Sequence, residues 1–144
     1  MLVSQILKSK ADDGVLTIRS GATVAEAARI LSERRIGSLV VSEDGRHAQG
    51  IVSERDIVRE IGRRGAGCLS DPVGSLMTRD VVTCTRDDMA DGVLAAMTAG
   101  RFRHLPVVDG AELVGLISIG DVVKARLSEL SMEKDALEGM IRGL

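Results

Sequence analysis

The chain contains one pattern twice, and this internal repeat limits its possible folds more than any other feature. Gly50 to Val58 and Gly115 to Val123 are apolar runs that lead into Ser-x-x-Asp, at an offset of 65 residues. Upstream, Ile36 to Val41 matches Phe102 to Val107 at an offset of 66. Such a period indicates one supersecondary unit that packs against its own copy. Because 144 residues are few for two independent cores, we expect two half-domains that share one core.

The hydrophobic periodicity changes in the same order within each copy. Apolar residues at helical spacing predict one helix with a single buried stripe in each repeat. The stripe residues are Val24, Ala27, Ala28 and Leu31 in the first copy and Ala90, Val93, Leu94 and Met97 in the second. Two strands and another helix follow, so each unit is predicted to have the order β-α-β-β-α. The predicted fold class is α/β, of the α+β type, with two tandem repeats.

Short apolar runs and turn residues predict the strands. Leading strands are expected at 15–18 and 81–84, and hairpins are expected to begin at Ile36 and Phe102. Turn residues close both hairpins, and Asp109-Gly110 is the stronger signal of the two. The other turn is Ser42 to Gly45. The expected boundaries are repeat one at 1–64, a linker at 65–75, repeat two at 76–126 and a helical extension at 127–144.

An apolar stripe predicts that the last helix continues well beyond Asp121. Its residues follow alternating steps of four and three: Val123, Leu127, Leu130, Leu137, Ile141 and Leu144, with Lys134 in the remaining core slot. The stripe fits two arrangements equally. The helix packs back on its own domain, or it pairs with a second copy of the chain.

Composition disfavours several classes of function. The formal net charge is −2 and Phe102 is the only aromatic residue, so the chain lacks the positive field and the stacking rings of nucleic-acid binding proteins. The two cysteines and two histidines have no zinc-ligand spacing, and no nucleophile stands beside a base, so neither a metal site nor an enzyme is expected. No run approaches the roughly 20 apolar residues of a membrane span, and no signal peptide is recognised. We expect a reduced, cytoplasmic protein.

Two segments carry a resemblance to a known family. One is the strand-to-helix segment with Ser-x-x-Asp in both copies, and the other is His104 to Asp109, which reads HLPVVD. At matched offsets and in the same element order, they resemble the cystathionine-β-synthase (CBS) domain pair, from about Leu2 to Lys124. Small stand-alone bacterial CBS-pair proteins look most similar, through the runs SERD at 53–56, GRFRHLPV at 100–107 and ISIGDVVKAR at 117–126.

The resemblance implies an architecture and a function. It implies that the repeats pack about a pseudo-twofold axis and that two pairs form a disc-shaped homodimer. Adenosine nucleotides such as AMP, ATP or NAD(H), or S-adenosylmethionine, are the expected ligands, bound in clefts between the repeats. The expected role is regulatory, sensing energy or redox state for an unknown protein partner. A CBS scaffold that dimerises without a ligand is the alternative.

The resemblance also assigns residues to each cleft. Asp56 and Asp121 are expected to hold the ribose, because a carboxylate accepts hydrogen bonds from both hydroxyls of a vicinal diol. The first cleft is expected to contain Ser53, Arg55, Asp56, Thr78, Val82, Phe102 and Arg103. The second is expected to contain Ser118, Asp121, Leu16, Ile36 and His104. Aliphatic pairs would contact adenine, namely Ile51 with Val82 and Leu16 with Leu116.

Ser-x-x-Asp has a second explanation, since it also matches a helix capping box. In that motif Ser53 and Ser118 satisfy backbone amides of the first helical turn, and the Asp side chains bond back to the cap residue. Capping and ribose binding are compatible roles.

Cations suggest that the two clefts differ. The chain has 15 arginines. Arg55, Arg103 and His104 are expected to bind phosphate, and Arg101 is a weaker candidate. A plain surface role is expected for Arg34, Arg35, Arg59, Arg63 and Arg64. Because Ser118 to Asp121 contains no cation, the first cleft is expected to bind its nucleotide more tightly.

Overall fold

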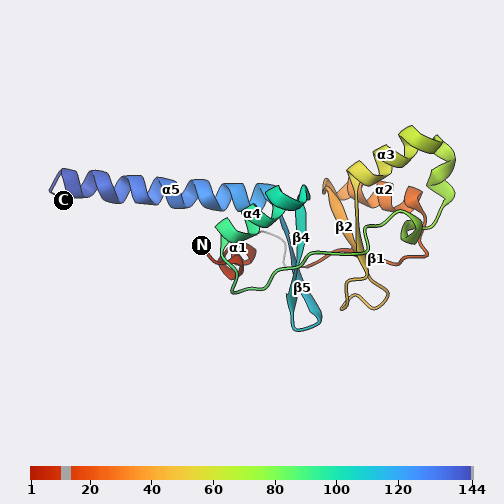
Figure 1. Ribbon diagram of the computed structural model, residues 1–144, viewed down its shortest axis with the longest axis horizontal. Helices are drawn as coiled ribbons and strands as arrows, with labels where there is room; N and C mark the ends of the chain where they lie inside the picture. Colours follow the sequence, from red (N-terminus) through yellow and green to blue (C-terminus); the bar gives the residue numbers. More distant parts are fainter. Residues whose placement is uncertain (11–13, 144) are drawn as a thin grey trace.

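The computed structural model describes residues 1–10 and 14–143 and has two lobes side by side, with a long helix leading away from one of them (Figure 1). The first lobe contains β1 (Thr17–Ile18), α2 (Val24–Arg34), β2 (Ser38–Val41), β3 (Gly50–Ser53) and α3 (Glu54–Arg64), then the short 3-10 helices η1 (Ala66–Ser70) and η2 (Val73–Ser75). The second lobe contains α1 (Val3–Ser9), α4 (Ala90–Gly100), β4 (His104–Asp109), β5 (Glu112–Ser118) and α5 (Ile119–Ile141). The predicted tandem fold with a long C-terminal helix is confirmed.

The sheets are small and differ between the lobes. In the first lobe β1 pairs parallel with β2, which pairs antiparallel with β3. In the second lobe β4 and β5 form an antiparallel pair. The leading strand expected at 81–84 is reduced to one parallel bridge between Cys84 and Val107. The chain just before it pairs Thr78 with Ile51 of the first lobe, so this segment crosses between lobes and cannot lengthen the second sheet.

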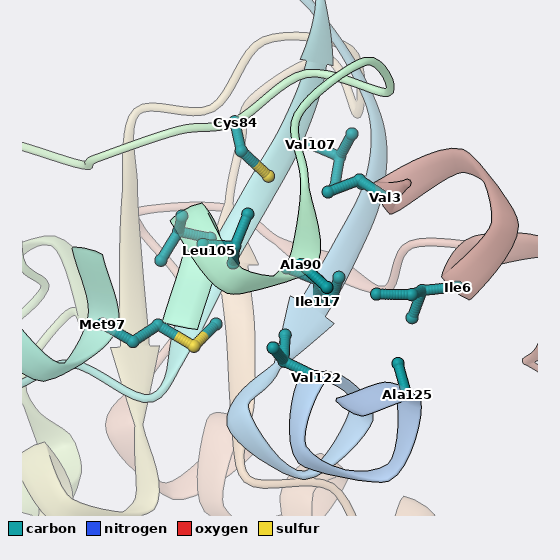
Figure 2. Packing of buried hydrophobic residues seen from close by; sticks show 11 residues of the cluster. Val3, Ile6, Cys84, Ala90, Met97, Leu105, Val107, Ile117, Val122 and Ala125 are labelled. Atoms are coloured by element: carbon teal, nitrogen blue, oxygen red, sulfur yellow. The ribbon is translucent and has the colours of Figure 1, made fainter. Parts of the chain in front are cut away.

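The residues that the structure describes form two hydrophobic clusters, one in each lobe, so the expectation of one shared core is wrong, and the predicted helix stripes contribute to both clusters. Leu31 of α2 and Met97 of α4 are buried, whereas Ala28 and Leu94 pack at the edges of the same clusters. Figure 2 shows the second-lobe cluster, where side chains from α1, α4, both strands and α5 converge. The stripes therefore bury α2 and α4 against their sheets, as the spacing predicts.

Each core is completed by a segment that precedes the other repeat. Val3 and Ile6 of α1 are buried in the second lobe, although α1 lies at the start of the chain. In the same way Val73 of η2 is buried in the first lobe. Matching antiparallel bridges, Leu2 with Met89 and Thr23 with Pro72, fix these segments. Through this exchange α1, although it precedes the first repeat in the sequence, packs in the second lobe.

Only the beginning of α5 packs against the body of the protein. Val122 and Ala125 are buried, and Glu129 accepts a hydrogen bond from the N-terminal ammonium group of Met1 at 2.8 Å. Beyond Glu129 the helix leads away from both lobes (Figure 1). The stripe residues from Leu127 onward are 51–78% exposed, namely Leu127, Leu130, Leu137 and Ile141, and Leu144 lies outside the described residues. The alternative in which the stripe packs back on its own domain is therefore wrong. Within residues 1–10 and 14–143, no helix has the length and apolarity needed to cross a membrane.

Candidate functional site

Two clefts are present, and each is lined by residues from both repeats. The Asp56 cleft has a volume of about 290 Å³ and the Asp121 cleft about 760 Å³. Around the Asp56 cleft lie Ser53, Arg55, Asp56, Thr78, Val82, Phe102 and Arg103. Around the Asp121 cleft lie Ser118, Asp121, Leu16, Ile36 and His104. The structure thus brings together every residue that the sequence assigned to each cleft, and the aliphatic pairs Ile51 with Val82 and Leu16 with Leu116 lie there too.

Both Ser-x-x-Asp segments form capping boxes. The Ser53 hydroxyl accepts a hydrogen bond from the Asp56 N–H at 3.2 Å, and the Asp56 carboxylate accepts one from the Ser53 N–H at 2.9 Å. Ser118 and Asp121 repeat this geometry at the start of α5, at 3.1 and 2.9 Å. The capping explanation is confirmed. It also fixes each carboxylate at the wall of its cleft, since both cap bonds lock the side chain in place.

Asp121 has a further partner that the sequence did not suggest. The Lys10 ammonium group donates hydrogen bonds to Asp121 Oδ2 at 2.9 Å and to the Leu116 carbonyl oxygen at 2.8 Å. Burial alone would raise the pKa of Asp121, but the hydrogen bonds from Lys10 and Ser118 outweigh it and leave the pKa below its usual value. Asp121 is therefore a carboxylate held by a cation within the cleft.

The cations of the two clefts differ from the expected distribution. The basic residues around the Asp121 cleft are Lys8, Lys10, Arg35 and Arg86, and Asp121 is the acidic residue among its described lining residues. Around the Asp56 cleft, Arg55, Arg59, Arg101 and Arg103 are offset by Glu54, Asp56 and Asp80. Cations from other segments thus line the Asp121 cleft, although Ser118 to Asp121 itself contains none, and the tighter binding expected of the Asp56 cleft stays a prediction. Arg35 and Arg59, expected to be plain surface residues, also line clefts.

Gly37, Ser38 and His104 form a wall that both clefts share. A Cβ at Gly37 would lie 3.2 Å from His104 Cε1, so the glycine allows the imidazole to approach the backbone of the first lobe. Burial lowers the pKa of His104, while the charges of Asp121 and Glu54 oppose this shift. The imidazole is thus more readily kept neutral than an exposed histidine.

The side chains that line the clefts suit the binding of a small ligand. No group of three His, Cys, Asp or Glu side chains within the described ranges could hold a metal ion. The clefts combine a fixed carboxylate, basic side chains and aliphatic walls. These groups can bind a ligand that has hydroxyl groups, negative charge and an apolar ring.

Comparison with known proteins identifies the family. The CBS domain model matches residues 3–63 and 73–128. The chain belongs to the CBS domain family. It is 34% identical to the mitochondrial CBS domain-containing protein CBSX3 of Arabidopsis thaliana, over 98% of this chain and 72% of the relative.

Two solved structures of CBS proteins are similar in fold to this CBS pair. One is a CBS-domain containing protein from Agrobacterium tumefaciens, with a TM-score of 0.83 and 40% identity over 88% of this chain and 99% of the other. The second is a CBS domain protein from Pyrobaculum aerophilum complexed with AMP, with a TM-score of 0.78 and 28% identity over 92% of this chain and 99% of the other.

Proposed function

We propose that this CBS pair is a regulatory module that binds adenosine nucleotides in its clefts and acts as a homodimer. The observation that carries the proposal is the fixed carboxylate on the wall of each cleft. Asp56 and Asp121 are held by their capping boxes, and basic and aliphatic side chains from both repeats line the same clefts. This combination suits a ligand with hydroxyl groups, negative charge and an apolar ring.

The chemistry of the clefts supports an adenosine ligand in particular. Asp56 and Asp121 each use Oδ2 for the cap. Oδ1 of Asp121 is left to accept a hydrogen bond from a ribose hydroxyl, whereas Oδ1 of Asp56 already accepts one from Arg59 at 3.4 Å and has one further lone pair for the ribose. Aliphatic side chains line both clefts and suit an adenine ring, and the arginines and lysines beside them suit phosphate. AMP, ATP and NAD(H) share these three parts. The AMP complex of the relative from Pyrobaculum aerophilum adds support.

The difference between the clefts suggests different ligands. The Asp121 cleft is the larger one, and Lys10 and Arg86 on its wall already pair with Asp121 and Asp109, which leaves Lys8 and Arg35 as its other basic lining residues. Its volume and these two cations favour the larger, more highly phosphorylated ligand there. The Asp56 cleft, which is smaller and has three carboxylates, suits a ligand with less charge, such as AMP. The chain would then report a ratio of nucleotides instead of the amount of one.

Regulation requires that the ligand bind two conformations unequally. Asp121 lies in the first turn of α5, the helix whose far end extends from the body (Figure 1). A ligand that displaces Lys10 from Asp121 would change the contacts of both α1 and α5. This gives the Asp121 cleft a direct mechanical connection to the exposed helix.

A thermal-shift titration tests ligand binding. AMP, ADP, ATP, NAD⁺, NADH and S-adenosylmethionine would be added to the wild type and to Asp56→Ala and Asp121→Ala. A ligand at 100 times its Kd should stabilise the wild type by about 2.7 kcal/mol. Asp91→Ala is the matched control, because Asp91 also lies in the first turn of a helix but lines neither cleft. The proposal fails if no adenosine compound raises the wild-type Tm.

We propose that the exposed stripe of α5 contributes to the homodimer. Its 4-3 spacing suits pairing with the same helix of a second copy of the chain. Lys134, which occupies one core position, is the kind of polar residue that fixes the register of paired helices. An apolar stripe of this length on a monomer would otherwise remain in water. Truncation after Arg126 should convert a dimer to a monomer in light scattering, and the single variant Leu130→Glu should do the same. A dimer that survives both changes refutes this role of α5.

The ligand-free scaffold is a second candidate, favoured by the same stripe because it needs no nucleotide. The thermal-shift series distinguishes the two functions. We propose no catalytic step, since the Ser53 and Ser118 hydroxyls serve the helix caps. A cytoplasmic location fits the two buried, unpaired cysteines, which a reducing compartment keeps as thiols.

A further inference from the structure

Arg35 and Arg101 are the only non-glycine residues with positive φ in the ranges that the structure describes. Their φ and ψ angles are 54° and 47° for Arg35 and 57° and 37° for Arg101. The two residues are 66 positions apart, which is the offset of the repeat, and each directly follows a helix, α2 or α4. The same rare conformation therefore occurs twice, with the same side chain.

The backbone explains the left-handed turn but not the arginine. The Arg35 N–H donates to the Leu31 carbonyl oxygen, and the Arg101 N–H donates to the Met97 carbonyl oxygen, as is usual at the end of a helix. Glycine makes the same bonds without the clash between Cβ and the backbone that disfavours L-residues here. Arginine is thus present at both positions at a cost to folding stability.

The two side chains have no structural partner within the described residues that would account for this cost. Some arginines pair with carboxylates, as Arg29 does with Glu33 at 3.2 Å, but Arg35 and Arg101 make no ion pair or hydrogen bond there. Arg19, Arg34, Arg55, Arg103 and Arg142 also have no such partner among the described residues, but none of these has a positive φ. Both instead line clefts. Arg35 lies on the Asp121 cleft and Arg101 on the Asp56 cleft.

We infer that Arg35 and Arg101 are equivalent phosphate ligands, one for each cleft, and that the strained turns are retained to place them there. The inference rests on the proposed nucleotide binding and names the residues that recognise phosphate. A guanidinium group bonds two phosphate oxygens in a planar fork, which suits a residue with no protein partner. Each arginine then distinguishes a nucleotide from the nucleoside that lacks phosphate.

Calorimetry with AMP and adenosine tests the inference, one cleft at a time. Asp56→Asn leaves the Asp121 cleft to be measured, and Arg35→Gly is added to it. Asp121→Asn leaves the Asp56 cleft, and Arg101→Gly is added to it. In each case AMP affinity should fall about tenfold or more, as for loss of a charged hydrogen bond, while adenosine affinity stays within about twofold. The Tm should equal or exceed that of the parent, because glycine relieves the turn.

Arg34→Ala is the control, since Arg34 ends the same helix and lines neither cleft. It should leave AMP affinity unchanged. AMP affinity that is also unchanged in both glycine variants overturns the inference, as does an equal loss of AMP and adenosine, which would indicate a structural role. If the wild type binds neither AMP nor any other adenosine compound of the thermal-shift series, the proposed function itself is wrong.

Discussion

Lys10→Met should destabilise the chain by about 1–2 kcal/mol at pH 7. The Lys10 ammonium group bonds Asp121 Oδ2 and the Leu116 carbonyl oxygen, and the Lys10 and Asp121 side chains are 30% and 24% exposed. A fully exposed ion pair contributes about 0–1 kcal/mol and a hydrogen bond to a charged group about 1.5–3 kcal/mol. Partial exposure places this pair between the two ranges. Urea unfolding of the wild type and Lys10→Met measures the difference.

A double-mutant cycle with Asp121→Asn separates the pair from other effects of Lys10. The coupling energy should be about 1 kcal/mol, against about 0.3–0.5 kcal/mol for the exposed pair of Arg29 and Glu33, which is the control. The folded-state pKa of Asp121 is lowered, so the contribution is present above the unfolded value of about 3.9 and disappears as pH falls through the folded pKa. A coupling no larger than that of the control, or one that does not weaken as the pH is lowered below the unfolded value of about 3.9, refutes the reasoning.

Three further changes follow from local packing and charge. Gly50→Ala should cost about 1–3 kcal/mol, because its Cβ would lie 2.7 Å from the Thr78 carbonyl oxygen. Gly14→Ala should cost little, since no atom of the described residues lies within 4 Å of a Cβ there. Equal urea midpoints for the two variants would contradict this. The folded-state pKa of His104 is lowered, so the unfolded chain binds the proton more readily and the free energy of unfolding should decline below about pH 6.5. His104→Gln should flatten that decline. Parallel pH profiles for the wild type and the variant would argue against this role of His104. Burial, assisted by the charge of Asp88, raises the pKa of the Cys84 thiol to about 11. Iodoacetamide should therefore modify Cys84 slowly at pH 8 in the native protein and rapidly in urea. A native rate equal to the rate in urea would contradict this.

The repeat predicted the parts of the molecule that depend on local sequence. Ser53 and Ser118 mark the helix starts because the cap is a local motif, and this placed Asp56 and Asp121 on their clefts. The long helix was equally readable, since its 4-3 spacing is a property of one segment.

The missed features depend on packing between distant segments. Nothing in the sequence around Lys10 relates it to Asp121, because their pairing requires α1 to pack on the lobe formed by the other repeat. Likewise, Arg35 was grouped with surface charges, because a left-handed turn is normally signalled by glycine or asparagine and neither stands there. The equivalence of Arg35 and Arg101 at an offset of 66 was the one available signal.

The stoichiometry of AMP binding by calorimetry tests the central claim most directly, that both clefts are nucleotide sites. The wild type at saturating AMP should bind two molecules per chain. Asp56→Asn and Asp121→Asn should each bind one, at the cleft left intact, and the double variant none. No binding heat with wild type, or full binding by the double variant, would contradict the account.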